Sequence, residues 1–172
     1  CVHAAFYQGA SSDETLKRVM DATHDILKHR SKDFPDVNLA YETMGKPTQF
    51  GTYAELFVVA KEFDIFPCVD FAHIHARCNG AENSTKEWVA QFEAYAKALG
   101  KKSLKKMHMH YSGIEYTVKG ERRHLQFPQS DARWKDLLCV LKKYDVGGTM
   151  VVESPLLEEE TILLANTYNR LK

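Results

Sequence analysis

The sequence predicts an α/β fold in which a parallel sheet is built from five successive strand–helix units. Short apolar segments alternate with longer amphipathic segments along the 172 residues, which is the order of elements found in parallel sheets. Clear helix-start signals separate the two kinds of segment. These signals fit either an open parallel sheet or part of a closed (β/α)8 barrel, which typically takes about 250 residues.

Five segments are apolar or β-branched enough to be buried strands. They are residues 2–6, 37–41, 66–71, 104–109 and 149–152. Helices are predicted between and after these strands, because apolar residues recur there at spacings of three and four. Leu16, Val19 and Met20 belong to such a pattern in the first helix, and Trp88 and Phe92 to a similar pattern in a later one. Each helix therefore has one face to bury.

Three helix starts fit the capping box, in which a Ser or Thr and a Glu three residues later satisfy each other's backbone N–H groups. These boxes begin at Ser11, Thr52 and Ser84. We expect the last helix to open at Ser154 and Pro155, with serine as the N-cap and proline at the first helical position.

The composition predicts one soluble domain over residues 1–172 with no strong charge of either sign. The hydrophobic share is 44%, and 23 basic residues balance 23 acidic ones, so the chain lacks the overall basic field common in nucleic-acid-binding proteins. No apolar stretch approaches the roughly 20 residues of a membrane helix, and no signal-peptide pattern is present. We expect a cytoplasmic protein with no membrane partner and no obligate protein partner.

The cysteines are scattered without any Cys-x-x-Cys pair. They are Cys1, Cys68, Cys78 and Cys139. Because thiolate zinc sites and disulfide frameworks usually show paired spacings, this distribution argues against both. Any metal ion would then be held by other residues.

Potential metal ligands lie at the ends, or in the first positions, of all five predicted strands. They are His3, Glu42, Asp70 with His73, His108 and Glu153. Sites in barrels and open α/β sheets assemble at the carboxyl ends of strands, so these residues are expected to converge on one face. A mixture of imidazole and carboxylate suits zinc or manganese at a catalytic site. His75 and His110 are alternates close to the stronger candidates.

In order and spacing, these motifs resemble those of the endonuclease IV family, which has a xylose isomerase-like TIM barrel. The matching motifs are Val2-His3-Ala4-Ala5, Tyr41-Glu42-Thr43, Asp70-Phe71-Ala72-His73, Met107-His108-Met109 and Val152-Glu153-Ser154. The resemblance implies that the chain forms strands four to eight of a barrel, as a single partial TIM-barrel domain without the N-terminal units. Those units would carry a further histidine ligand and loops that enter DNA.

The resemblance also implies an activity and a role for each residue. Endonuclease IV enzymes cleave DNA on the 5′ side of abasic sites with three zinc ions. By motif, His3 binds the first ion, Glu42 bridges the first and second, and His73 holds the third, with Glu42 and Glu153 as catalytic residues. The other assigned ligands are Asp70, His108 and Glu153 for the second ion and Glu121 and His124 for the third. Arg77 and Arg122 are candidate phosphate contacts.

Two rival interpretations remain open at the level of the sequence. A sugar isomerase or epimerase would gather Glu, Asp and His around one or two divalent metals at the strand ends. It would leave His73, Glu121 and His124 without a metal role. Alternatively, the chain is an inactive, truncated barrel that binds metals or partners through open sheet edges.

Overall fold

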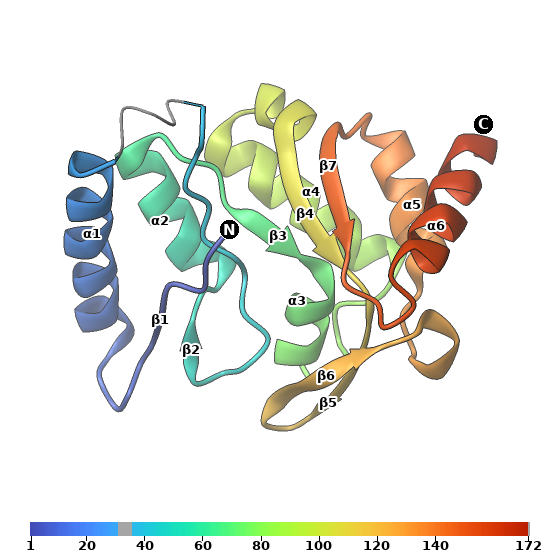
Figure 1. Cartoon of the computed structure of the whole chain (residues 1–172), viewed down its shortest axis with the longest axis horizontal. Coiled ribbons are helices and arrows are strands. Elements are labelled where there is room, and N and C mark those ends of the chain that lie inside the picture. The colour runs from blue at the N-terminus through green and yellow to red at the C-terminus, as the bar shows by residue number, and fades with distance from the viewer. Residues whose placement is uncertain (31–35, 172) are drawn as a thin grey trace.

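The computed structural model describes residues 1–30 and 36–171. Its central sheet contains three parallel strands in the order β3 (Cys68–Asp70), β4 (Met107–Tyr111) and β7 (Gly148–Val152). Figure 1 shows α1 (Ser12–Lys28) and α2 (Tyr53–Phe63) at one end of the molecule and α5 (Trp134–Lys143) and α6 (Glu158–Arg170) at the other, with the sheet between them. The predicted α/β class with a parallel sheet is confirmed.

Two further segments extend this parallel row through single bridges. Val2 pairs with Tyr41, and Glu42 pairs with Cys68 at the start of β3. Backbone hydrogen bonds from Glu42 N to Val2 O (3.1 Å) and from Cys68 N to Tyr41 O (2.9 Å) join the three segments. Each of the five predicted parallel segments therefore lies beside the next one along the chain. The first two form only single bridges and are too short to count as strands.

The strand boundaries differ from the prediction in several strands. The predicted strand at 66–71 is shorter, at Cys68–Asp70, and Phe71 already belongs to the helix that follows. The chain turns away after its first bridge, because β1 (Ala5–Phe6) pairs antiparallel with β2 (Gln49–Phe50) in a separate ribbon. Residues Lys101–Lys106 form a 3-10 helix, so the predicted strand at 104–109 begins only at Met107. A second 3-10 turn covers Phe127–Gln129.

The helices cover the sheet and follow the predicted pattern. They are α1 (Ser12–Lys28), α2 (Tyr53–Phe63), α3 (Phe71–Arg77), α4 (Thr85–Leu99), α5 (Trp134–Lys143) and α6 (Glu158–Arg170). Capping boxes are present at Ser11, Thr52 and Ser84, as the sequence predicts. Each box supplies partners for N–H groups that the helix itself leaves free.

The predicted start of the last helix at Ser154 is wrong. The Ser154 hydroxyl accepts a hydrogen bond from Leu156 N (3.1 Å), and its carbonyl accepts one from Leu157 N (2.9 Å). These bonds close a turn in place of a helix cap. Helix α6 begins at Glu158, after Leu157 with a φ of 47°.

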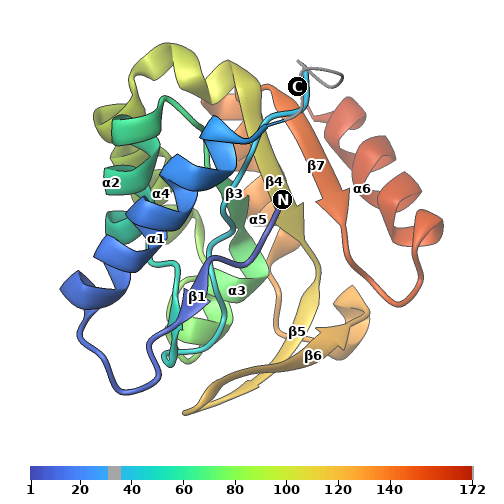
Figure 2. The same cartoon turned by 60° about the vertical axis from the view of Figure 1, so that its left-hand side comes forward.

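An antiparallel hairpin that the sequence analysis did not predict follows β4. Its strands are β5 (Gly113–Thr117) and β6 (Gly120–Leu125), joined at Val118 and Lys119. In both cartoon views the hairpin lies beyond the ends at which β3, β4 and β7 finish (Figures 1 and 2). It therefore borders the face on which the strand-end residues were expected to meet.

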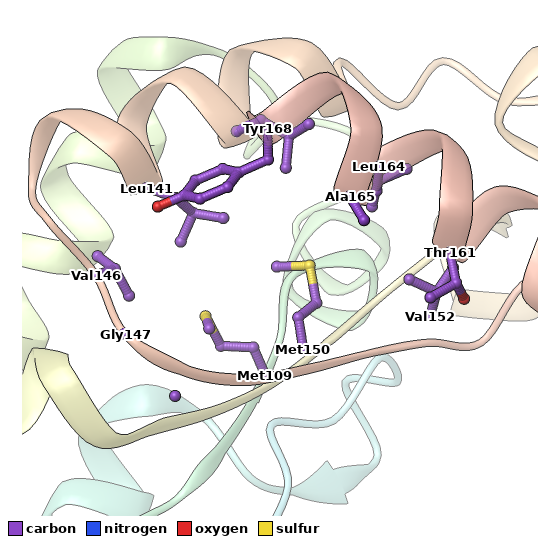
Figure 3. A pocket seen from close by; sticks show the side chains of 12 residues that line it. Met109, Leu141, Val146, Gly147, Met150, Val152, Thr161, Leu164, Ala165 and Tyr168 are labelled. Atoms are coloured by element: carbon purple, nitrogen blue, oxygen red, sulfur yellow. The ribbon is translucent and has the colours of Figure 1, made fainter. Parts of the chain in front are cut away.

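The main hydrophobic core lies between the sheet and the helices. Phe71 and Trp88 pack edge to face in it, with ring centroids 5.4 Å apart. An apolar cavity of about 230 Å³ lies in this layer. Met109 and Met150 of the sheet face Tyr168 of α6 across it (Figure 3). Because alternate residues of a strand point to opposite faces, the neighbours of Met109 point away from the helices.

Within the described residues, no helix is both long and apolar enough to cross a membrane.

Candidate metal centre

Four side chains from four neighbouring parallel segments converge at the carboxyl end of the sheet. Glu42, Asp70, His110 and Glu153 each offer a ligand atom, and these atoms all lie within 4.8 Å of one another. The parallel register explains the convergence, since Asp70 lies opposite His110, and the hydrogen bond from Glu153 N to Tyr111 O (3.1 Å) continues the pairing of β4 with β7. We call these four residues the carboxylate cluster.

Glu42 lies at the centre of the site and contacts three histidines. Its Oε1 lies 3.1 Å from His110 Nδ1 and 3.3 Å from His73 Nδ1, and its Oε2 lies 3.4 Å from His3 Nε2. Burial alone would raise the pKa of Glu42, but hydrogen bonds from His110 and His73 outweigh burial and hold that pKa well below its usual range. The two oxygens therefore face different histidines, as a carboxylate bridging two ions would.

Asp70 is fully buried and only partly satisfied. Its Oδ1 accepts a hydrogen bond from His73 N (2.8 Å) at the start of α3, while Oδ2 has no hydrogen-bond partner among the described residues. Burial raises the pKa of Asp70 to about 7. A buried carboxylate oxygen without a partner is costly unless something positive binds it.

His73 is oriented by a backbone carbonyl. Its Nδ1 lies 3.0 Å from Thr43 O, and because a carbonyl only accepts, this nitrogen carries the proton. The opposite nitrogen, Nε2, is therefore the one that could bind a metal ion after losing its proton, an arrangement common for metal-binding histidines. Burial would lower the pKa of His73, but the carboxylates of Asp70, Glu42 and Glu121 raise it to about 10. The surroundings thus strongly favour positive charge.

The hairpin brings two more of the predicted ligands to His73. Glu121 Oε2 lies 3.2 Å from His73 Nε2 and has no hydrogen-bond partner among the described residues. The rings of His124 and His73 have centroids 5.7 Å apart, and His124 Nδ1 lies 2.7 Å from Ser112 Oγ. Burial lowers the pKa of His124, which keeps its imidazole neutral. We call His73, Glu121 and His124 the hairpin cluster.

A glycine makes the approach of the hairpin possible. The Glu121 side chain lies so close to Gly45 that a Cβ at position 45 would overlap it, and Glu121 N donates to Gly45 O (3.0 Å). Gly45 follows Glu42 by three residues, so the same loop serves both clusters.

The structure places His110 where the sequence analysis placed His108, which is a correction to that assignment. His108 lies opposite Cys68, one full strand repeat further from the carboxyl end than His110. Since side chains two residues apart point to the same face, sequence spacing alone could not separate the two histidines. His110, treated there as an alternate, contacts both Glu42 and Glu153.

The two candidate phosphate contacts are engaged elsewhere. Arg77 Nη1 donates to the carbonyls of Lys46 (2.6 Å) and Gln49 (2.9 Å), so it anchors the loop that follows Glu42. Arg122 is exposed and pairs with Glu115 at 3.0 Å. Only Arg122 has a charge that a substrate can readily reach.

The residues present fit a divalent metal centre. Both clusters contain a buried carboxylate oxygen without a hydrogen-bond partner among the described residues, and both combine oxygen with imidazole nitrogen. Of the two, the carboxylate cluster is the one whose ligand atoms all lie within 4.8 Å of one another. Such mixed sites suit zinc or manganese. His3 is the least enclosed member, with a side chain 57% exposed.

Comparison with known proteins identifies relatives of the chain. Residues 1–166 match the family model described as the xylose isomerase-like TIM barrel. The chain is also 40% identical over 169 residues to an uncharacterized protein of Methanocaldococcus jannaschii. That alignment covers 98% of the chain and 62% of the relative, so the chain spans less than two thirds of that protein's length.

Proposed function

The chain belongs to the xylose isomerase-like TIM barrel family, and from this membership and its metal-ligating clusters we propose that it is a zinc-dependent phosphodiesterase that cleaves DNA 5′ to abasic sites. The observation that carries the proposal is the adjacency of the two clusters. His73 lies 3.3 Å from Glu42 of the carboxylate cluster and 3.2 Å from Glu121 of the hairpin cluster. Ligands for more than one ion therefore share one face.

These contacts suggest which residues would bind each ion. The carboxylate cluster would hold one ion, the hairpin cluster a second, and Glu42 Oε2 with His3 would contribute to a third. Zinc ions bound there would polarise water and offset the charge of a phosphodiester. Asp70 Oδ2 and Glu121 Oε2 support this use, because both are buried carboxylate oxygens that have no hydrogen-bond partner among the described residues and contact the His73 ring.

The chain's own residues supply the remaining steps. Glu153, with a side chain 34% exposed, is the most accessible carboxylate of its cluster and would accept a proton from the attacking water. Lys46, whose Nζ lies 3.6 Å from Glu121 Oε1, borders the hairpin cluster and would contact a backbone phosphate, and the exposed Arg122 of β6 would contact another. The abasic nucleotide would leave the helix stack to reach the buried ligands.

Incubation of the protein with zinc and a duplex containing one abasic site tests the proposal. We expect a single nick 5′ to the site, and we expect Glu153→Gln to slow it by about 10²–10⁴-fold, the usual contribution of a general base. Glu159→Gln, an exposed carboxylate in the first turn of α6, is the matched control and should cleave at the wild-type rate. Intact DNA in the presence of zinc, or full activity of Glu153→Gln, would overturn the proposal.

A metal-dependent sugar isomerase or epimerase is the second candidate. The observation in its favour is that the carboxylate cluster is complete in itself, with ligand atoms for one ion. Such an enzyme would exchange a sugar C–H proton with solvent, so deuterium incorporation into a ketose in heavy water distinguishes it. Glu121→Gln separates the two functions, because it should impair the phosphodiesterase and spare an isomerase.

A further inference from the structure

A different group of metal-ligating side chains lies deeper along the same strands. Cys1, Cys68, His108 and His110 each offer a ligand atom, and these atoms all lie within 4.8 Å of one another. We call these residues the thiol cluster. It shares His110 with the carboxylate cluster, and its other three members have no part in the proposed phosphodiesterase.

The parallel register explains why these residues meet. Cys68 lies opposite His108, and it is also the bridge partner of Glu42. Side chains two residues apart on a strand point to the same face. Cys68 and His108 therefore lie directly behind Asp70 and His110, one layer further from the carboxyl ends of the strands, as in the stacked side-chain layers of a barrel interior.

The remaining thiol comes from the neighbouring segment. Cys1 precedes His3 by two residues, and Cys1 Sγ lies 3.5 Å from Glu42 Oε2. Its side chain is therefore on the same inner face, and Cys68 beside it is fully buried. Both cysteines are free thiols, although 67 residues separate them in sequence (68 − 1).

The distances and the ligand types fit a tetrahedral site for a thiophilic ion. With Zn–S bonds near 2.3 Å and Zn–N bonds near 2.0 Å, tetrahedral ligand atoms lie roughly 3.3–3.8 Å apart. Atoms already within 4.8 Å need to move inward by only about 1 Å to reach such distances. Two thiolates would balance the charge of a divalent ion, so no further counter-ion is required beside the buried strand.

We propose that the thiol cluster is a separate binding site for a thiophilic transition-metal ion of the zinc type, with Cys1, Cys68 and His108 as its own ligands and His110 shared. Binding releases the two thiol protons to solvent and forms two metal–sulfur bonds, with no change in oxidation state. Where the carboxylate cluster also holds an ion, His110 would bind both ions through its two ring nitrogens and release its remaining ring proton as well. The ion ties the first parallel segment to β3 and β4 behind the carboxylate cluster. The proposal does not depend on the reaction that the neighbouring clusters support.

Cobalt(II) substitution in the reduced protein tests the proposal, because thiolate ligands give a near-ultraviolet sulfur-to-cobalt absorption that oxygen and nitrogen ligands do not. We expect this absorption to reach saturation at one ion per chain. Cys68→Ser should abolish it, while Cys139→Ser, an exposed cysteine of α5, should retain it. It should also survive in Asp70→Asn, which impairs only the carboxylate cluster. No sulfur-to-cobalt absorption in the reduced wild type, or an unchanged band in Cys68→Ser, overturns the proposal.

A second measurement uses the unmodified protein, so that misfolding of a variant cannot decide the outcome. Cys1, Cys78 and Cys139 are all exposed, and the last two belong to neither group of metal-ligating residues. Zinc should slow alkylation of Cys1 by about tenfold or more, because a metal-bound thiolate is a poor nucleophile, and leave Cys78 and Cys139 unchanged. Equal alkylation of Cys1 with and without zinc overturns the site.

Discussion

Two buried carboxylate sites in this chain differ in how completely their oxygens are satisfied. Glu55, near the start of α2, accepts hydrogen bonds from Tyr7 and Ser12 at Oε1 and from Gly51 and Thr52 at Oε2. These donors hold its pKa at about 2, although burial opposes that shift. At the carboxylate cluster the neighbours of each acid are other acids and histidines.

The contrast separates a carboxylate that stabilises the fold from carboxylates arranged for binding. Glu55 joins β1, α1 and α2 through hydroxyl and backbone donors, so its charge is compensated without a ligand. Asp70 has an oxygen without a hydrogen-bond partner among the described residues, and burial raises its pKa to about 7 in spite of the nearby His73, so its charge opposes folding in the metal-free protein. The same residue chemistry therefore has opposite effects on stability in the two places.

The largest expected effect follows from removing the charge of Glu42. This residue contacts His3, His73 and His110 at once, so Glu42→Gln should weaken zinc binding by about 100-fold or more, beyond what loss of an outer-shell partner costs. Competition titration against a chelator of known affinity measures the change. Glu55→Gln is the matched control and should bind zinc like the wild type, and equal affinities for all three proteins would contradict the distinction.

Glu55→Gln should instead destabilise the protein. Loss of charge-assisted hydrogen bonds should lower the free energy of unfolding by about 1–3 kcal/mol at neutral pH. Because the folded-state pKa is below the ordinary glutamate value of 4.5, this stabilisation is present above about pH 5 and is lost as the pH falls toward 2. Urea unfolding at several pH values checks the prediction. A constant difference down to pH 2 would disprove the role of the Glu55 charge.

Asp70→Asn should raise the stability of the metal-free protein, whereas Glu55→Gln lowers stability. A folded-state pKa near 7, raised from 3.8, means that stability falls as the pH rises between those values and stays low above 7. An uncharged amide removes that penalty and can still accept the hydrogen bond from His73 N. Thermal unfolding at pH 8 with a chelator present should give a higher midpoint for Asp70→Asn than for wild type. A lower midpoint would contradict the account.

Substitutions of Arg77 and Arg122 should lower stability by different amounts, and this difference is the smallest effect expected. Arg77 binds carbonyls of the loop that follows Glu42, so Arg77→Met should cost about 1–3 kcal/mol of stability by leaving these acceptors unpaired. Arg122→Gln removes an exposed ion pair and should cost less than about 1 kcal/mol. Urea unfolding measures both changes, and equal costs would contradict the assignment of Arg77 to the loop.

Local signals in the sequence predicted the elements that depend on local chemistry. The capping box from Thr52 to Glu55 identified the start of α2 because both of its hydrogen bonds form within three residues. The five parallel segments followed from apolar patterning, and the family from the strand-end motifs. The turn at Ser154 was missed because serine and proline fit a turn as well as a helix start.

Contacts between distant segments were harder to predict. His108 and His110 are two residues apart, so their side chains point to the same face of the sheet. Only the register of β4 against β3 identifies the histidine nearest Asp70. Cys1 and Cys68 lack any local spacing that marks a site, and they meet only because the first and third segments both adjoin the second. The roles of Glu121 and His124 depended on the hairpin, which the sequence analysis did not predict.

Elemental analysis of bound zinc tests the central claim most directly, namely that the strand-end carboxylates form a multi-ion metal centre. After dialysis to remove loosely bound metal, we expect the Cys68→Ser protein, which lacks the thiol cluster, to retain more than one ion per chain. Adding Asp70→Asn to it should remove at least one of these ions, and adding Glu55→Gln should remove none. A protein that retains no zinc, or equal zinc contents in all three variants, would contradict the claim.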